Sequence, residues 1–270
     1  MSTQTATAPR TKKRKRSQLA EVWRRFMKNH MAVGGLVILG VLILVACFAP
    51  QLAPYGFDDQ DYSIALQDAS LAHPCGTDNL GRDIFSRLLY GSRVSLSVGL
   101  ISVGIGVTVG GLLGALAAFY GSKIDNTIMR LLDILMAIPS TILAISICAA
   151  LGPGMTNTMI AVGISGIPKY ARVVRSAVLT AKQQEYVEAA RAIGAGDRRI
   201  IFRHLIPNSM APIIVQASMG IASAILAAAS MSFIGLGIQP PNPEWGQCSQ
   251  RAGAISGIIP TWCSIPVWPL

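Results

Sequence analysis

The stretch VSLSVGLISVGIGVTVGGLLGALAAFY, residues 94–120, contains no charged residue. It is longer than the roughly 20 apolar residues that a membrane-spanning helix needs. Small residues recur at every fourth position along it: Ser102, Gly106, Gly110, Gly114 and Ala118. This spacing places them on one face of a helix, where they allow a neighbouring helix to approach closely in lipid. The stretch therefore predicts a spanning helix that packs in a bundle, and the same face could also serve as a sliding contact.

Four other apolar stretches have the composition of spanning helices: residues 31–53, 127–151, 155–170 and 210–236. Pro139 predicts a kink in the second of them. The last one repeats the four-residue spacing of small residues with Gly220, Ala224, Ala228 and Ser232. Hydrophobic residues make up 51% and charged residues 13% of the 270-residue chain, and its mean hydropathy is +0.49. We therefore expect an all-α polytopic membrane helical bundle with five spanning helices.

The charged residues are unevenly distributed, which predicts how the helices are oriented. Residues 1–30 hold nine Lys/Arg and one Glu, and residues 171–209 hold seven Lys/Arg and three acids, whereas residues 54–93 hold three Arg and six Asp. Basic loops remain in the cytoplasm, so both basic segments are expected inside and residues 54–93 outside. A net charge of +10 can indicate nucleic-acid binding, but TKKRKR lacks interleaved aromatic residues. We expect contact with membrane lipid and none with nucleic acid.

The segment 171–209 is amphipathic and charged, unlike the stretches around it. EYVEAARAIGA contains good helix formers, Gly194 and Gly196 can end the helix, and Asp197 can cap a second one. A helix–break–helix lying along the membrane, with a polar exposed face, suits docking to a soluble partner. An ordinary solvated connector is the alternative.

The residues of this segment carry a family resemblance. EAARAIGAGDRRIIFRHLIPN, residues 188–208, resembles the E-A-A…G…L/I-P loop of permease subunits of ABC importers that depend on a binding protein. The matching positions are Glu188, Ala189, Ala190, Gly194 and Pro207. The resemblance implies that Glu188 to Gly194 form a coupling helix, which docks into a cleft of an ATP-binding subunit. Small residues would allow the close approach, and Glu188 would supply a polar contact.

Three further stretches look like the second-permease type of dipeptide, oligopeptide and nickel importers: residues 73–99, 129–145 and 232–247. The resemblance implies a type I importer permease of the bacterial inner membrane that forms half of a translocation pathway. The implied partners are a second permease subunit, two ATP-binding subunits and a periplasmic substrate-binding protein. The substrate would be a dipeptide or oligopeptide, with nickel, glutathione-like peptides and D,D-dipeptides as alternatives.

Catalytic motifs are missing from the sequence. It has no G-x-x-x-x-G-K-[ST] phosphate loop, no H-E-x-x-H and no G-x-S-x-G. We therefore expect no enzyme activity and no cofactor in this chain, with ATP hydrolysis on partner subunits. The other reading, a membrane enzyme or an anchoring subunit, would need paired acids or a His cluster at the membrane face.

Several polar residues remain to be explained. Arg130 and Asp133 lie three residues apart on a predicted spanning helix, so they can form an intramembrane pair with a structural role or a role in gating. His73, Asp78, Arg82 and Asp83 are expected to form a hydrogen-bonded loop. The five cysteines have no metal-ligand spacing.

The sequence divides into four parts: a basic tail with a possible interfacial helix (1–30), the first span and the outer loop (31–93), a permease core (94–247) and an aberrant tail (248–270). The family pattern is expected to continue past Gln247 with a sixth span, but the chain reads CSQRAGAISGIIPTWCSIPVWPL. Restoring one nucleotide before codon 248 allows the reading MLSAGRGYIRDYPHLVLYPGLA, which resembles the family. We therefore expect a frameshifted, truncated and inactive copy; a naturally divergent tail is the alternative.

Overall fold

A computed structural model describes residues 26–246 and residue 248. The described part is helical, and its one extended feature is an isolated bridge between Thr77 and Asp83. The predicted all-α bundle is confirmed. Its long helices are α2 (His30–Leu52), α3 (Ile84–Tyr120), α4 (Ser122–Met136), α5 (Ser140–Leu151), α6 (Met155–Lys182) and α10 (Met210–Phe233).

The chain divides into two units, Met1–Leu44 and Val45–Leu270, with the boundary inside α2. The described part of the first unit is the beginning of α2, which exposes Val37, Ile38 and other apolar side chains. Exposed apolar residues on a helix of this length suit contact with lipid. In the second unit, Ala46 and Ala49 of α2 are buried.

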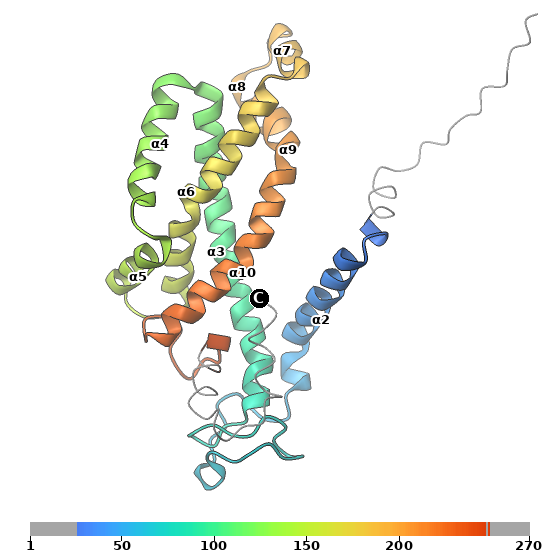
Figure 1. Cartoon of the computed structure of the whole chain (residues 1–270), viewed down its shortest axis with the longest axis vertical. Helices are drawn as coiled ribbons and strands as arrows, with labels where there is room; N and C mark the ends of the chain where they lie inside the picture. Colours follow the sequence, from blue (N-terminus) through green and yellow to red (C-terminus); the bar gives the residue numbers. More distant parts are fainter. Residues whose placement is uncertain (1–25, 247, 249–270) are drawn as a thin grey trace, which may run out of the picture. The chain divides into compact units, whose positions relative to one another are not determined.

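Helices α3, α6 and α10 form the centre of the second unit and run side by side (Figure 1). The small-residue face of α3 packs against α6, as the four-residue spacing predicts. A Cβ atom added to Gly110 would lie 2.6 Å from the Ile167 carbonyl oxygen, and one added to Gly114 would lie 2.3 Å from the Ala171 carbonyl oxygen. Because no side chain fits into these contacts, glycine at 110 and 114 permits the two backbones to touch.

The face of α10 with small residues also points into the bundle. Ala224, Ala228 and Ser232 are buried, and a Cβ atom at Gly220 would lie 1.9 Å from the Tyr170 hydroxyl oxygen of α6. Tyr170 therefore fills the space between α6 and α10 at the level where α10 lacks a side chain.

The predicted kink at Pro139 is a complete break. Helix α4 ends at Met136, α5 begins at Ser140, and the two axes differ in direction by 85°. Pro139 is the residue before the first turn of α5, where its lack of an N–H group costs no hydrogen bond.

Three described helices, α2, α3 and α10, are individually long and apolar enough to cross a membrane, and the bent pair α4–α5 raises the number to four. Helix α6 is not one of them. It carries Lys169, Arg172 and Arg175 and continues to Lys182, so the first part of the charged segment 171–209 is helix and not loop. The count of five spans remains a prediction.

Candidate functional site

The residues expected in the coupling helix lie at one end of the bundle, on α7 (Glu185–Ala192) (Figure 1). Val187 and Ala190 are buried in a core cluster with Phe119 of α3. Glu188 and Ala189 are exposed on the same helix. Helix α7 is thus amphipathic: one face packs against the bundle, and the opposite face is exposed to solvent.

Basic side chains from the end of α6 and from α7 contact the end of α3. The Lys182 amino group donates hydrogen bonds to the Ala118 and Phe119 carbonyl oxygens, at 3.2 and 2.6 Å. These are among the last carbonyls of α3, which have no partner within the helix. The Arg191 guanidinium lies 5.6 Å from the centre of the Phe119 ring, within the range of a cation–π contact. The end of α3 therefore fixes the position of α7.

Gly194 ends α7 in a left-handed conformation, with a φ of +77°. A Cβ atom at this position would meet nothing within 4 Å, so the residue faces open space. Helix α8 (Asp197–Ile200) follows after Gly196, and Asp197 is its first residue and not the cap that the sequence suggests. Gly196 takes the cap position, and no side chain caps α8.

The structure brings Glu188, Ala189, Ala190 and Gly194 together but separates Pro207 from them in the fold. A π-helical turn, Ile201–Leu205, leads from α8 to the short α9 (Ile206–Asn208). Pro207 is exposed within α9, directly before α10. Pro207 lies in the first turn of α9, where its missing N–H group is tolerated.

Two ion pairs join α4 to α6, and the sequence pattern did not reveal either. Arg175 donates two hydrogen bonds to the Asp125 carboxylate, and Arg172 donates one to Asp133, at 2.5 Å. The predicted pair of Arg130 with Asp133 is therefore not formed. Asp133 lies on the face of α4 that meets α6, where Arg172 offers a closer partner.

The opposite end of the bundle is built from residues 54–83 and 234–246. Arg82 and Asp78 are buried, and the Arg82 guanidinium donates two hydrogen bonds to the Asp78 carboxylate, at 2.9 and 2.6 Å. His73 lies 3.1 Å from Asp83 through their Nδ1 and Oδ1 atoms. Asp83 also accepts a hydrogen bond from the Ser86 N–H and so caps α3. These four side chains form the hydrogen-bonded loop that the sequence predicts.

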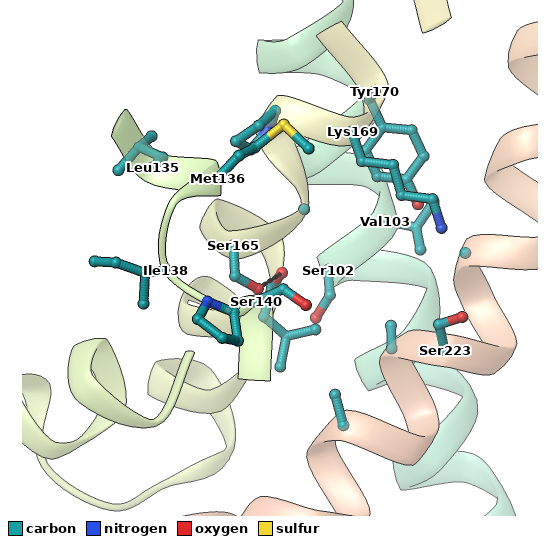
Figure 2. Close-up of a pocket in the computed structure, with 17 residues that line it drawn as sticks. Ser102, Val103, Leu135, Met136, Ile138, Ser140, Ser165, Lys169, Tyr170 and Ser223 are labelled. Atoms are coloured by element: carbon teal, nitrogen blue, oxygen red, sulfur yellow. Dashed lines mark hydrogen bonds between the residues drawn. The ribbon is translucent and has the colours of Figure 1, made fainter. Parts of the chain in front are cut away.

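Between the two ends, a cavity of about 320 Å³ lies among α3, the α4–α5 break, α6 and α10. The hydroxyl groups of Ser102, Ser140 and Ser165 point into its middle (Figure 2). Lys169 and Tyr170 line it from α6, and Ser223 lines it from α10. Its volume is at the small end of the range for small-molecule sites, about 300–1,000 Å³.

The described helices, several of which are apolar and long enough to cross a membrane, enclose a mainly apolar cavity and carry an exposed amphipathic helix at one end, an arrangement that suits a membrane permease. The family described as the inner membrane component of binding-protein-dependent transport systems matches residues 110–265. The N-terminal transmembrane domain of oligopeptide transport permease C matches residues 17–74. The chain belongs to the binding-protein-dependent transport permease family. The match continues past Gln247, where the resemblance was expected to end, and residues 249–270 lie outside the described part of the chain.

Curated relatives support this assignment over most of the chain. The glutathione transport system permease protein GsiD of Pectobacterium atrosepticum is 45% identical over 91% of this chain and 82% of its own length. The di/tripeptide transport system permease protein DppC of Pseudomonas aeruginosa is 47% identical over 85% of this chain and 78% of its own length. DppC of Alkalihalophilus pseudofirmus, a dipeptide permease, is 46% identical over 84% and 75%.

A solved structure shares the fold. The inward-facing MetNI methionine ABC transporter contains a chain that is 21% identical, with a TM-score of 0.57 over 67% of this chain and 87% of that one. The likeness supports the fold of an ABC importer permease. It accounts for the helices and carries no information about the substrate of this chain.

Proposed function

We propose that this chain is a permease subunit of an ATP-driven importer of dipeptides or oligopeptides and forms half of the translocation pathway. The observation that carries the proposal is the exposed face of α7, held at one end of a transport-permease bundle. Glu188, Ala189 and Gly194 are accessible there, while Val187 and Ala190 anchor the helix. A rigid helix with an exposed, small-residue face suits a tight contact with a soluble subunit.

The proposed partners are a second permease subunit, two ATP-binding subunits and a periplasmic substrate-binding protein. ATP binding would close the ATP-binding subunits around α7, and ATP hydrolysis would take place on those subunits. Since Val187 and Ala190 of α7 share a core cluster with Phe119 and Arg191 lies over the Phe119 ring, a displacement of α7 would move the bundle. In this way the ATPase would drive the change between outward and inward states.

Glutathione is a second candidate substrate, because GsiD relatives are about as similar to this chain as the peptide permeases, at 45% against 46–47% identity. The same machinery could carry nickel or D,D-dipeptides. All of these use one pathway and one coupling helix, so they differ in cargo and not in mechanism.

The test is uptake into proteoliposomes that contain this chain with its partner subunits, ATP inside and the binding protein outside. Labelled dipeptide, tripeptide, glutathione and Ni²⁺ are compared at equal concentration. We expect peptide uptake that requires both ATP and the binding protein. Uptake of Ni²⁺ alone would refute the peptide assignment, and uptake of none of these cargoes would refute the transport function of the 270-residue chain.

A further inference from the structure

We infer that Lys169 and the α4–α5 break form a binding site for the carboxylate of the transported peptide, inside the membrane part of this subunit. The inference rests on the proposed function and adds to it a specific chemical contact. It starts from the position of Lys169, which lines the 320 Å³ cavity. Within the described part of the chain, Lys169 has neither a hydrogen bond nor an ion pair.

Lys169 is exposed on α6, at the level of the middle of the apolar helices α3 and α10. The next residue, Tyr170, packs against Gly106 of α3 and Gly220 of α10. Gly106 lies in the middle of the uncharged stretch 94–120, and Gly220 lies in the middle of α10 (Met210–Phe233). A basic side chain at this depth is costly in lipid, and such residues in membrane proteins usually face a pathway or a partner charge. None of the residues that line the cavity in the described part is Asp or Glu.

A second positive feature opens into the same cavity. Helix α5 begins at Ser140, next to Pro139, and both residues line the cavity. No side chain caps this helix, so the N–H groups of its first turn are available at the end of the helix with partial positive charge. Half-helices that point their N-termini at anionic groups of the substrate are a common device of membrane transporters.

A third feature is the hydroxyl of Tyr170. The side chain is buried, with 5% of its surface exposed. Its hydroxyl lies against Gly220 at the cavity wall and has no hydrogen-bond partner among the described residues. Among the described residues the one buried side-chain N or O atom without a partner is the Ser209 hydroxyl, so the Tyr170 hydroxyl is accessible from the cavity, where a ligand or water can form a hydrogen bond with it. Figure 2 shows the Lys169 side chain running beside Tyr170 towards α10, so both polar groups can reach one anion.

These groups together match a peptide carboxylate. The carboxylate accepts charge-assisted hydrogen bonds from the Lys169 amino group and further bonds from Tyr170 and the N–H groups of α5. The serine hydroxyls of Ser102, Ser140 and Ser165 would contact the peptide groups behind it. An acidic side chain of the second permease subunit could neutralise Lys169 alone, but it would leave the helix end and the tyrosine hydroxyl without a role. For this reason we favour the substrate.

The direct test measures chemical protection and does not require transport. Membranes containing the chain with its partner subunits are treated with an amine-acylating reagent, and modification of Lys169 and Lys123 is followed by mass spectrometry. An N-acetylated dipeptide and its C-terminal amide are compared, since neither carries a reactive amine. We expect the carboxylate peptide to slow acylation of Lys169 and not of Lys123, which does not line the cavity, and the amide to protect neither. Equal protection by both peptides, or by neither, would overturn the inference.

Transport supplies the second measurement. Lys169→Met removes the charge at similar length, Lys169→Arg retains it, and Lys123→Met is the matched control. Loss of a charge-assisted contact should lower uptake of the carboxylate peptide by about tenfold in Lys169→Met, with Lys169→Arg and Lys123→Met close to wild type. Uptake of the amide, measured with saturated binding protein, should not fall.

Equal loss of both peptides in Lys169→Met, together with loss of the second permease subunit on purification, would assign Lys169 to the subunit interface and overturn the inference. If the wild-type complex transports no peptide at all, the proposed function fails, and the protection experiment still decides whether the cavity binds a carboxylate.

Discussion

Asp125 on α4 and Arg175 on α6 form a two-pronged ion pair: Nε and Nη2 of the guanidinium donate to the two carboxylate oxygens at 2.6 and 2.5 Å. Both side chains are partly buried, with 15% and 34% of their surfaces exposed. Arg172 and Asp133 form a second, more exposed pair between the same two helices. The two pairs hold α4 against α6, although the helical segment is interrupted at Pro139 between α4 and α5.

We expect Asp125→Asn to destabilise the protein by about 1–2 kcal/mol, because it removes a paired charge from a partly buried site. Arg175→Lys should have a similar effect, since lysine cannot form the two-pronged contact. Thermal unfolding in detergent, with Asp133→Asn as the control, checks this. An equal or larger effect of Asp133→Asn would show that burial does not strengthen the Asp125 pair.

The contact between α3 and α6 predicts a sharp difference between neighbouring glycines. A Cβ atom at Gly114 would lie 2.3 Å from the Ala171 carbonyl oxygen, whereas one at Gly111 would meet only Val174, at 3.9 Å. Gly114→Ala should therefore separate the helices and cost about 1–3 kcal/mol, and Gly111→Ala should be close to neutral or slightly stabilising. Melting temperatures of the two variants measure the difference, and similar values would argue against the close approach of the helices.

The predicted orientation can be tested with two exposed positions. Ala189 lies on the open face of α7, and Leu71 is fully exposed at the opposite end. In intact cells, a membrane-impermeant thiol reagent should label Leu71→Cys and should label Ala189→Cys only after the membrane is opened. Ala190 is unsuitable because it is buried. Labelling of Ala189→Cys from outside would reverse the topology.

Cys248 is partly exposed by surface area, but protein atoms surround its thiol. Burial raises the pKa of its thiol from the ordinary 9.0 to about 11, although the nearby Arg87 acts in the opposite direction. Because the thiolate is the reactive form, a pKa raised by two units makes the thiol about ten- to a hundredfold slower to react at pH 8. Alkylation of Cys248 in the folded protein should increase up to about pH 11. The same protein in SDS is the control, and equal rates in both would contradict the raised pKa.

The sequence was sufficient to predict the all-α bundle and the apolar helices α2, α3 and α10, but not the continuation of α6 to Lys182. Uncharged length decides whether a helix can span, and the four-residue spacing of glycines at 106, 110 and 114 identifies the packed face before any partner helix is known. A kink at Pro139 was predictable, but the complete break with its 85° angle was not, because it depends on what α4 and α5 pack against.

Ion pairs between residues on different helices could not be predicted from the sequence. Arg130 and Asp133 have a spacing that suits one helix, yet Asp133 pairs with Arg172 of α6, since the direction of α4 is set by tertiary packing. The eight-residue spacing of Asp125 and Asp133 and the three-residue spacing of Arg172 and Arg175 were the available signals. The cavity around Lys169 was similarly hidden, because its residues come from separate helices.

Gly194 lies in the turn that follows α7, where a large side chain would obstruct a docked subunit. A side chain there would point into open space, so Gly194→Trp should reach the membrane normally but block the ATP-binding subunit. Because the backbone is left-handed at this position, Gly194→Asn is the control: asparagine tolerates this conformation and is small. ATPase subunits should co-purify with Gly194→Asn and be lost from Gly194→Trp. Retention by both would place the docking surface elsewhere.

The central claim is that α7 couples this subunit to an ATPase, and charge reversal on α7 tests it most directly. Glu188→Arg and Glu185→Arg make the same change at two exposed positions of one helix, but only Glu188 belongs to the matched motif. ATP-dependent peptide uptake into proteoliposomes is measured at equal amounts of inserted protein. We expect Glu188→Arg to lower uptake by about tenfold or more and Glu185→Arg to retain most of it. Undiminished uptake by Glu188→Arg would contradict the account.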